Sequence, residues 1–532
     1  MFDYVVIGGG SAGCVLASRL TEDPSTRVAL LEAGSADHSS MIHCPAGLAL
    51  MAKSPGLNWR FQTVPQAGLN GRSGYQPRGK VLGGSSSINA MVYIRGQQAD
   101  YDAWAAEGNP GWGYQDLLPY FKRAEHNSRG ADAWHGQGGP LQVQDLMQPN
   151  RSTGLFVQAA QQAGHALNPD FNGATQEGVG TYQVTHKGGE RCSAAKGYLG
   201  LAQGRPNLQV FTGAQATRIL FDGRRATGVE YLQGGSRQQL MARAEVLLTA
   251  GALQSPQLLM LSGVGPAEHL LAMGLSVLHA MPGVGAQLHD HVDVTQVVDA
   301  PTAKDLFGLS LHGLIQGIKG VMEWRRQRTG LLTTNFAEAG GFIRSSADRP
   351  APDLQLHFVI GKLIDHGRKT VFGHGYSCHV CLLDPASRGS LRLASADPLA
   401  APLIDPAFLQ APDDLTRLVS GFKLMRQILQ QPALAGLGGR ELAASTAAQT
   451  DAQIADYIRS HADTIYHPVG SCRMGPGAND VVDADLRVKG LQGLRVVDAS
   501  IMPRVVSGNT NAPTIAIAEK ASDLIKAAHR AA

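Results

Sequence analysis

The chain has 532 residues, of which 43% are hydrophobic and 17% charged, a composition typical of a globular protein large enough for more than one core. A formal net charge of only +3, with no lysine- or arginine-rich block, excludes nucleic acid as a partner. Six cysteines in a chain of this length do not indicate a disulfide scaffold. No leader precedes the first strand, and there is no run of 18 apolar residues. We therefore expect a cytoplasmic protein that does not span a membrane.

The first predicted elements are a buried strand over residues 4–7, a glycine turn and a helix, in FDYVVIGGGSAGCVLASRL. The turn has the spacing G-x-G-x-x-G. Gly8 allows a tight turn, Gly10 lets a pyrophosphate approach the backbone, and Gly13 lets helix and strand pack closely. The free N–H groups at the start of the helix, from Ser11 onward, then favour phosphate binding.

A second predicted strand, in RVALLEAG, ends at Glu32, which follows Gly13 by 19 residues. A carboxylate at this place binds the ribose hydroxyls of an adenosine and repels a 2′-phosphate. The alternative is a βαβ unit without a ligand, but strand, motif and acidic residue together favour a dinucleotide. These residues do not separate NAD from FAD.

A second glycine cluster lies in GKVLGGSSSINAMVYIRG, residues 79–96. This cluster predicts a turn with small side chains, at Gly83, Gly84 and Ser85, whose backbone can approach a flat or charged ligand closely. A serine-rich surface loop is the alternative. The apolar residues that flank the turn instead indicate a loop held against a core.

A third segment, GALQSPQLLMLSGVG at 251–265, follows an apolar strand. Together with DTIYHPVG at 463–470 and SGNTNAPTIAIAE at 507–519, these segments resemble, in order, the motifs of the glucose–methanol–choline (GMC) oxidoreductases, which are FAD-dependent flavoproteins. Within that family the chain is most similar to bacterial alkanol and choline-type alcohol dehydrogenases.

The resemblance implies an α/β fold with a doubly wound, Rossmann-like FAD domain. It implies that this domain is assembled from residues 1–150, 190–300 and 460–532. A second, α+β domain with a mainly antiparallel sheet, from residues 151–189 and 301–459, then supplies the substrate pocket.

Within the second domain, alternating side chains predict three strands of its sheet, at 353–360, 376–383 and 389–395. Apolar residues at helical spacing after an acidic start predict a helix over 412–431.

The resemblance also implies further contacts to FAD, at Asn89, Ala216, Asp498 and Asn511, with Asn511 against the pyrimidine edge of the flavin. Some members of the family join FAD covalently to a histidine two residues after the double serine of the second glycine loop. Ile88 occupies that place here. Because isoleucine cannot form such a bond, we expect the FAD to be non-covalent.

His467 is the predicted catalytic base among 18 histidines. Flavin oxidation of an alcohol needs a base for the hydroxyl proton, and histidine has a suitable pKa. Pro468 holds His467 extended, and the resemblance places the catalytic histidine of the family in this H-P-V-G.

The second active-site position of the family, a histidine in many relatives, falls at Asn509. Asparagine is not a base, but it donates and accepts hydrogen bonds. We therefore expect His467 to take the proton and Asn509 to orient the hydroxyl. The alternative for Asn509 and Asn511 is turn formation in GNTNAP.

The function implied by the resemblance is oxidation of a primary alcohol to an aldehyde, with electrons passed to a quinone or another carrier. An oxygen-using alcohol oxidase and a choline dehydrogenase remain alternatives, as does a flavin-containing hydroxynitrile lyase from another class. Choline needs an aromatic cage and a carboxylate. With 6% aromatic residues in the chain, simple alkanols are the first choice.

Two pairs of residues have the spacing of metal ligands. Cys378 and Cys381 form a single C-x-x-C in a strand-like stretch, which favours two buried thiols over redox chemistry or half a zinc site. His289 and His291 lie on one face if their segment is a strand, and a metal there is the less favoured alternative. We therefore predict no metal site.

The last predicted feature is an apolar stripe beside basic residues within 307–328. Phe307, Leu311, Leu314, Ile318 and Val321 have the spacing of one helix face, and Lys319, Arg325, Arg326 and Arg328 gather toward its end. Such a segment is compatible with peripheral contact at the inner face of the cell membrane. The alternative is packing on its own domain.

Overall fold

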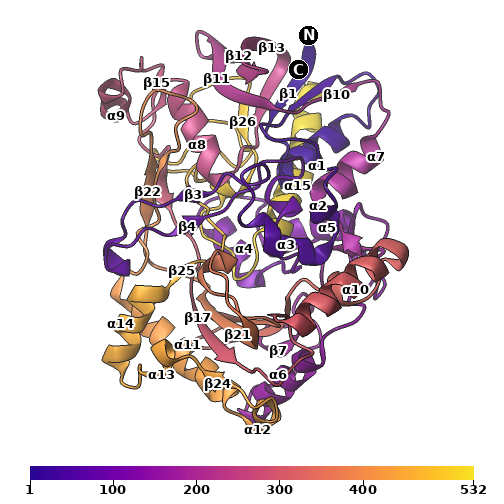
Figure 1. Cartoon of the computed structure of the whole chain (residues 1–532). Coiled ribbons are helices and arrows are strands. Elements are labelled where there is room, and N and C mark those ends of the chain that lie inside the picture. Colours follow the sequence, from indigo (N-terminus) through magenta and orange to yellow (C-terminus); the bar gives the residue numbers. More distant parts are fainter. Residues whose placement is uncertain (532) are drawn as a thin grey trace.

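The computed structural model describes residues 1–531 and places two sheets at opposite ends of the molecule (Figure 1). The first sheet has the strand order β10-β2-β1-β13-β12-β11, with β26 on β13, and the pairs among β10, β2, β1, β13 and β26 are parallel. Its strands are β1 (Phe2–Ile7), β2 (Val28–Leu31), β10 (Leu208–Phe211), β11 (Ala214–Asp222), β12 (Arg225–Gln233), β13 (Ser236–Leu248) and β26 (Leu494–Val496).

Helices from both ends of the chain cover this sheet. All six residues of β1 are buried, as expected for a parallel strand covered on both faces. Helix α1 (Ser11–Leu20) packs against α15 (Asn511–Ala531), and Arg19 forms an ion pair with Glu519 at 2.8 Å. The two ends of the chain therefore lie together in one layer, near the N and C labels of Figure 1.

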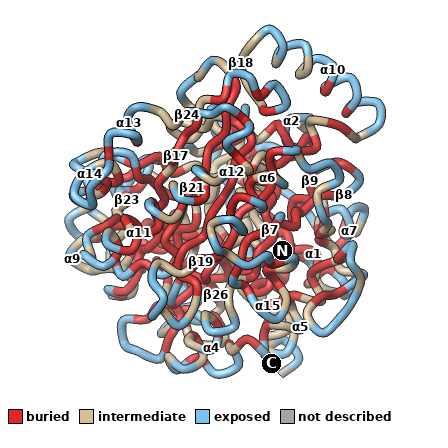
Figure 2. Tube along the Cα trace, turned by 90° about the horizontal axis from the view of Figure 1, so that it is seen from below, coloured by how far each residue is buried: buried red, intermediate tan, exposed pale blue. Residues whose placement is uncertain are grey.

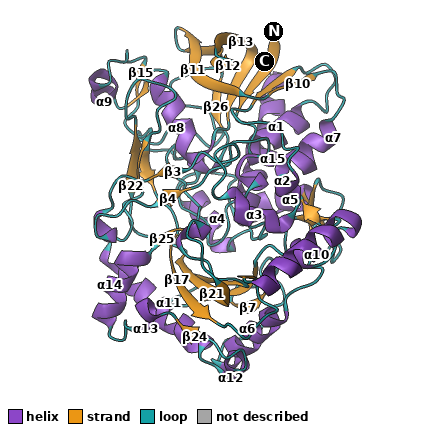
Figure 3. Cartoon of the chain, viewed as in Figure 1, coloured by secondary structure: helices purple, strands orange, loops and turns teal. Residues whose placement is uncertain are grey.

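The second sheet is antiparallel, with the order β24-β17-β21-β20-β19-β7 and with β18 and β25 on its borders (Figure 3). Its strands are β7 (Gly178–Thr181), β17 (Val292–Asp299), β18 (Gly308–Leu309), β19 (Ala337–Ile343), β20 (Leu354–Val359), β21 (Gly373–Leu382), β24 (Arg440–Glu441) and β25 (Asp463–Thr464). Helices α6 (Arg151–Gln162), α11 (Pro412–Leu429) and α14 (Asp451–His461) pack on one face.

The remaining elements connect these layers. The longer ones are α4 (Gln98–Ala106), α5 (Tyr114–Ala124), α8 (Gly251–Leu261), α9 (Ala267–Ala272) and α10 (Leu311–Gln327). The short helices are α2 (Ser40–His43), α3 (Leu48–Met51), α7 (Gly200–Ala202), α12 (Pro432–Ala435) and α13 (Ala443–Thr446). The small sheets contain β3 (Phe61–Gln62), β4 (Tyr75–Gln76), β5 (Glu125–Asn127), β6 (Leu141–Val143), β8 (His186–Lys187), β9 (Glu190–Arg191), β14 (Val264–Gly265), β15 (His279–Ala280), β16 (Ala286–Leu288), β22 (Gly389–Arg392) and β23 (Leu403–Asp405).

The predicted fold class, a parallel sheet with helices plus a mainly antiparallel sheet, is confirmed. Two strands lie elsewhere than expected. The strand within 389–395, β22, pairs with β16 and β23 in a separate sheet and not with β21. β17, inside the predicted FAD segment 190–300, pairs with β21 of the second sheet. The domain boundaries themselves stay a prediction.

Helix α10 begins later than predicted. Ser310 caps it by accepting a hydrogen bond from the Gly313 N–H at 3.0 Å, so Phe307 lies outside the helix. The ring of Phe307 instead contacts Phe336, with centroids 4.6 Å apart. The prediction that Phe307 belongs to the helical stripe was wrong, because the cap stops the helix four residues short of it.

Among the described residues, no helix combines the length and the apolar character needed to cross a bilayer.

Candidate active site

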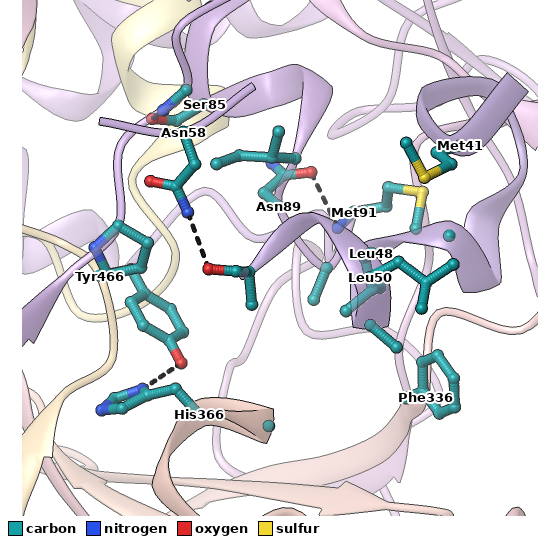
Figure 4. Close-up of a pocket in the computed structure, with 18 of the residues that line it drawn as sticks. Met41, Leu48, Leu50, Asn58, Ser85, Asn89, Met91, Phe336, His366 and Tyr466 are labelled. Atoms are coloured by element: carbon teal, nitrogen blue, oxygen red, sulfur yellow. Dashed lines mark hydrogen bonds between the residues drawn. The ribbon is translucent and has the colours of Figure 1, made fainter. Parts of the chain in front are cut away.

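A cavity of about 2210 Å³ is lined by residues from both sheets and from the loops between them. Ligand pockets are usually about 300–1,000 Å³. The cavity therefore has room for a large cofactor and a substrate together. Figure 4 shows part of its wall, where Ser85, Asn89, Met91 and Tyr466 lie around one space.

The predicted glycine turns meet at one end of this cavity. Gly8 has a φ of +107°, and a Cβ there would lie 2.6 Å from the Thr249 carbonyl oxygen. A Cβ on Gly13 would lie 1.9 Å from the Gly8 oxygen, which is the close helix–strand packing predicted for it. A Cβ on Gly84, whose φ is +53°, would lie 2.7 Å from the Gly10 Cα, so the two turns are in contact.

Glu32 lies immediately after β2 and lines the cavity with only 6% of its surface exposed. Its carboxylate accepts hydrogen bonds from the Gly9 N–H at 3.0 Å and the Gly34 N–H at 2.7 Å. Burial raises the pKa of this carboxyl to about 7, although both hydrogen bonds lower it. A carboxyl held in this way has lone pairs left for two neighbouring hydroxyl groups.

The first turn of α1 is tied to the start of α15. The Ser11 hydroxyl donates to the Asn511 Oδ1 at 2.7 Å, and both residues line the cavity. The Gly10 that precedes α1 supplies no side-chain cap, so the first N–H groups of the helix are open to a ligand.

Other predicted cofactor residues are held by hydrogen bonds. The Arg191 Nη1 donates to the Asn89 backbone oxygen at 2.7 Å and to its Oδ1 at 2.8 Å. The Asp498 carboxylate accepts from the Gly251 N–H at 2.9 Å and from the Ser255 hydroxyl. Burial raises the pKa of Asp498.

The structure brings most of the predicted cofactor residues to the cavity wall. Those that line it are Gly8, Gly10, Ser11, Glu32, Gly84, Ser85, Asn89, Ala216, Asp498 and Asn511. Gly13 and Gly83 do not line it. Gly83 instead donates its N–H to the Gly9 oxygen at 2.7 Å, which joins the two glycine turns. Open N–H groups, bare glycine backbone and a buried carboxyl fit a dinucleotide such as FAD.

The predicted base, His467, lies in the same cavity with 7% of its surface exposed. Its Nδ1 is 3.0 Å from the Nδ1 of His291, and the Nε2 of His291 is 2.9 Å from the Leu383 carbonyl oxygen. A carbonyl only accepts, so His291 carries its proton on Nε2 and offers a lone pair at Nδ1. His467 must then donate from Nδ1, which leaves its Nε2 unprotonated.

Asn509 faces that free nitrogen. Its Nδ2 lies 3.3 Å from the His467 Nε2, and its Oδ1 accepts from the Gln355 Nε2 at 3.2 Å. Gln355 therefore fixes which end of the amide points at His467. The structure brings together the two predicted catalytic residues, which are 42 positions apart in sequence.

Neutral imidazoles dominate this part of the cavity wall. Burial lowers the pKa of His467 well below its usual 6.5, and the neighbouring His291, His357 and Arg78 lower it further. Burial lowers the pKa of His291 to about 4. Both rings are therefore uncharged at neutral pH, as the tautomer assignment requires.

Three supporting residues were not predicted. His291 was considered only with His289 as a metal ligand, and Gln355 only as part of a strand. Asp290 is a third, because its carboxylate accepts the His467 N–H at 2.8 Å and so holds that residue through its backbone. Both Asp290 and His291 lie in the LHDH segment noted in the sequence, but their partner, His467, lies more than 170 residues further along the chain.

The pairs with metal-ligand spacing have other uses. His289 has both ring nitrogens in hydrogen bonds, to the Gln287 oxygen at 2.7 Å and to the Val505 N–H at 3.0 Å. Cys378 packs in the core of the second sheet, whereas Cys381 lies in a different apolar cluster. Among the described residues, no group of three or more metal-ligating side chains gathers.

A histidine–tyrosine contact borders the cavity next to the base. The Tyr466 hydroxyl is hydrogen-bonded to the His366 Nδ1 (Figure 4), and the His366 Nε2 lies 2.9 Å from the Asp463 Oδ2. Tyr466 has a φ of +80°, an uncommon conformation for a side chain of this size.

A dinucleotide cradle that opens onto a histidine–asparagine pair is the arrangement of a flavoprotein oxidoreductase. Two family models match the chain, the N-terminal GMC oxidoreductase model over residues 2–293 and the C-terminal one over residues 385–518. The chain belongs to the glucose–methanol–choline oxidoreductase family, whose members are FAD-dependent.

Individual relatives cover nearly the whole chain. An alcohol dehydrogenase [acceptor] from Pseudomonas putida is 49% identical, over 99% of this chain and 96% of the relative. A mitochondrial choline dehydrogenase from Mus musculus is 45% identical, over 99% and 89%. The solved structure of an FAD-dependent oxidoreductase from Chaetomium thermophilum is 28% identical, with a TM-score of 0.89 and 100% coverage of both chains.

Proposed function

We propose that this flavoprotein oxidises a primary alcohol to an aldehyde at His467 and Asn509 and passes the electrons to a quinone or a similar carrier. The observation that carries the proposal is the unprotonated Nε2 of His467, which faces Asn509 in the cavity. The full-length similarity to an alcohol dehydrogenase [acceptor] supports the same class of substrate and acceptor.

FAD supplies the hydride acceptor when bound. The His467 Nε2 takes the hydroxyl proton of the alcohol, and its Nδ1–H donates to His291 throughout, so the base keeps its orientation. The Asn509 Nδ2, held by Gln355, donates to the alcohol oxygen as negative charge develops on it. Loss of this proton from the oxygen, and of a hydride from the carbon that bears the oxygen, leaves an aldehyde.

The carboxylates of the cavity argue against choline as the substrate. Glu32, Asp305 and Asp498 are the acidic residues that line the described cavity. Glu32 lies at the first glycine turn, Asp498 is hydrogen-bonded to the start of α8, and Asp305 is exposed to solvent. Asp293, behind the cavity wall, is already paired with His379. A quaternary ammonium group therefore finds no free anionic partner beside His467.

The decisive experiment is an anaerobic screen of alcohols that follows flavin absorbance, with oxygen or a quinone added afterwards. Bleaching by a primary alcohol and reoxidation by quinone support the proposal. Reoxidation by oxygen at a comparable rate indicates an oxidase. Turnover of a hydroxynitrile without bleaching indicates a lyase.

Helix α10 supports a further part of the proposal, peripheral contact with the inner face of the cell membrane. Of its residues, only Gly320 and Trp324 are buried, and Figure 2 shows the helix at the border of the molecule. Leu311, Leu314 and Ile318 are 76%, 61% and 54% exposed. Such an exposed apolar face, with basic residues beyond it, matches a helix that lies in a lipid interface.

The same face lines the cavity, so a lipid-soluble quinone entering from the membrane reaches the cavity directly. Arg325 and Arg326 are exposed, whereas Arg328 is paired with Glu190 at 2.7 Å and stacked on Trp324. Of the three arginines, only Arg325 and Arg326 are therefore free to meet anionic headgroups, and Lys319 on the same helix is exposed as well.

The membrane proposal is tested by co-sedimentation of the holoenzyme with vesicles that contain or lack anionic lipid. The double variant Arg325→Glu/Arg326→Glu should lose binding to anionic vesicles. A control with the same charge change elsewhere, Arg224→Glu/Arg440→Glu, should keep it. Absence of wild-type binding, or equal loss in both variants, contradicts the proposal.

A further inference from the structure

The cavity face of the second sheet carries two histidines beside the catalytic pair. On β20, Leu354, Leu356 and Phe358 pack into the core under the sheet, so Gln355 and His357 point to the opposite face. His357 lies directly opposite His379 of β21, and both line the cavity.

These two rings have polar atoms that no described residue satisfies. His357 is 5% exposed, and neither its Nδ1 nor its Nε2 has a hydrogen-bond partner. The Nε2 of His379 is buried and unpartnered as well. Buried polar groups are nearly always paired. Three unsatisfied nitrogens on one patch of cavity wall therefore point to a ligand group that the patch is built to hold.

The position of the patch relates it to the reaction centre. Gln355 holds Asn509, and His357 follows Gln355 by two residues on the same face of the strand. That spacing is roughly 7 Å along a strand. A substrate whose reacting hydroxyl lies at Asn509 therefore reaches the histidines with a group a few bonds away.

The chemistry of the patch selects the kind of group. His379 donates from Nδ1 to the Asp293 carboxylate, so in its neutral form its Nε2 offers a lone pair to the cavity. Burial lowers the pKa of His357 to about 3, so this ring is neutral and provides one N–H and one lone pair. An acceptor beside a donor matches a hydroxyl group. The negative charge of the Asp293 carboxylate, behind the patch, disfavours the binding of an anionic group.

We propose that His357 and His379 form a subsite for a second hydroxyl group of the substrate, so that the chain prefers diols over the corresponding simple alcohols. This inference rests on the proposed alcohol oxidation. The hydroxyl donates to the His379 Nε2 and accepts from the His357 ring. An alkyl chain in the same place leaves those nitrogens unpaired, and such a mismatch discriminates strongly.

The test measures kcat/KM for anaerobic flavin reduction by α,ω-diols from propanediol to hexanediol and by the 1-alkanols of equal length. Wild type should prefer a diol, and His357→Leu should lower the diol-to-alkanol ratio about tenfold or more. His357→Asn, which retains a donor and an acceptor, should restore part of the ratio. His461→Leu, an exposed histidine of α14, should leave the ratio unchanged.

The outcomes separate this inference from the proposed function. If alkanols bleach the wild-type flavin but the ratio is the same in His357→Leu, the patch holds only water and the subsite is refuted. If no alcohol bleaches the flavin, the proposed oxidation itself fails. Flavin absorbance of each variant before the reaction shows that the fold and the cofactor site are intact.

Discussion

His291 and His467 meet through their Nδ1 atoms, 3.0 Å apart, with ring planes at 90°. The backbone oxygen of Leu383 determines the tautomer of His291, and His291 determines that of His467. A main-chain carbonyl thus leaves the His467 Nε2 unprotonated and ready to receive a proton. The same relationship makes the assignment of the base testable.

His467→Ala should bind FAD but reduce it on the order of 10²-fold more slowly, because Asn509 has no basicity to replace the ring. Anaerobic stopped-flow measurement of flavin bleaching checks this. Asn509→Ala should also slow bleaching, by loss of the donor to the alcohol oxygen. A His467→Ala enzyme as fast as wild type, with flavin bound, contradicts the assignment.

His291→Leu should slow flavin reduction at least about tenfold without loss of FAD, because the His467 Nδ1–H loses its acceptor and the ring is free to take the wrong tautomer. His291→Gln keeps a carbonyl acceptor and should recover part of the rate. The effect should appear in kcat more than in KM. Equal rates for the Leu and Gln variants indicate that His291 acts only by filling space.

The pH dependence of flavin reduction should be shifted toward acid. The base works only when unprotonated, and burial lowers the pKa of His467 well below 6.5. The rate should therefore stay constant from pH 8 to pH 6.5 and fall only at more acidic pH. A half-loss of rate at or above pH 6.5 shows that the buried ring is not the group that titrates.

Denaturation by acid or heat should release the FAD completely. Ile88 lines the cavity at the place where some relatives carry the covalent histidine, and its side chain has no atom that bonds to a flavin. Flavin absorbance in the supernatant measures the release. Fluorescence that migrates with the denatured protein on a gel excludes a non-covalent cofactor.

Glu32→Ala should lower FAD occupancy but leave the turnover of each bound flavin nearly unchanged. We expect the carboxyl to bind the adenosine end of FAD, far from the reacting atoms, and it also holds the N–H groups of Gly9 and Gly34. The ratio of flavin to protein absorbance, compared with turnover per flavin, separates the two effects. Glu268→Ala, on an exposed residue of α9, serves as the control.

The parts of the site that the sequence predicted are those encoded over short distances. The first glycine turn is an example, because Gly8, Gly10 and Gly13 contact one another or nearby backbone. Their spacing is therefore sufficient to predict their roles. The cores of β20, β21 and α11 follow from alternation or helical spacing within one segment. His467 and Asn509 were predicted through family resemblance, since nothing local distinguishes them from other histidines and asparagines.

The roles that were missed depend on contacts between distant segments. The partner of His291 lies 176 residues away, and that of Gln355 lies 154 away. The wrong placement of Phe307 has a local cause, because an apolar residue one turn before a helix has the same spacing as one within it. Ser310, a good capping residue directly before Leu311, was the signal that distinguishes the two.

The hydrogen bond between Ser11 and Asn511 has a consequence for biosynthesis. It joins residues 500 positions apart, and β26, a strand of the same sheet, is also among the last segments to leave the ribosome. At about 5–20 residues per second, synthesis of the chain takes roughly half a minute to two minutes. For that time the nascent chain presents its glycine turns without the segment that completes them, so we expect flavin loading to follow translation.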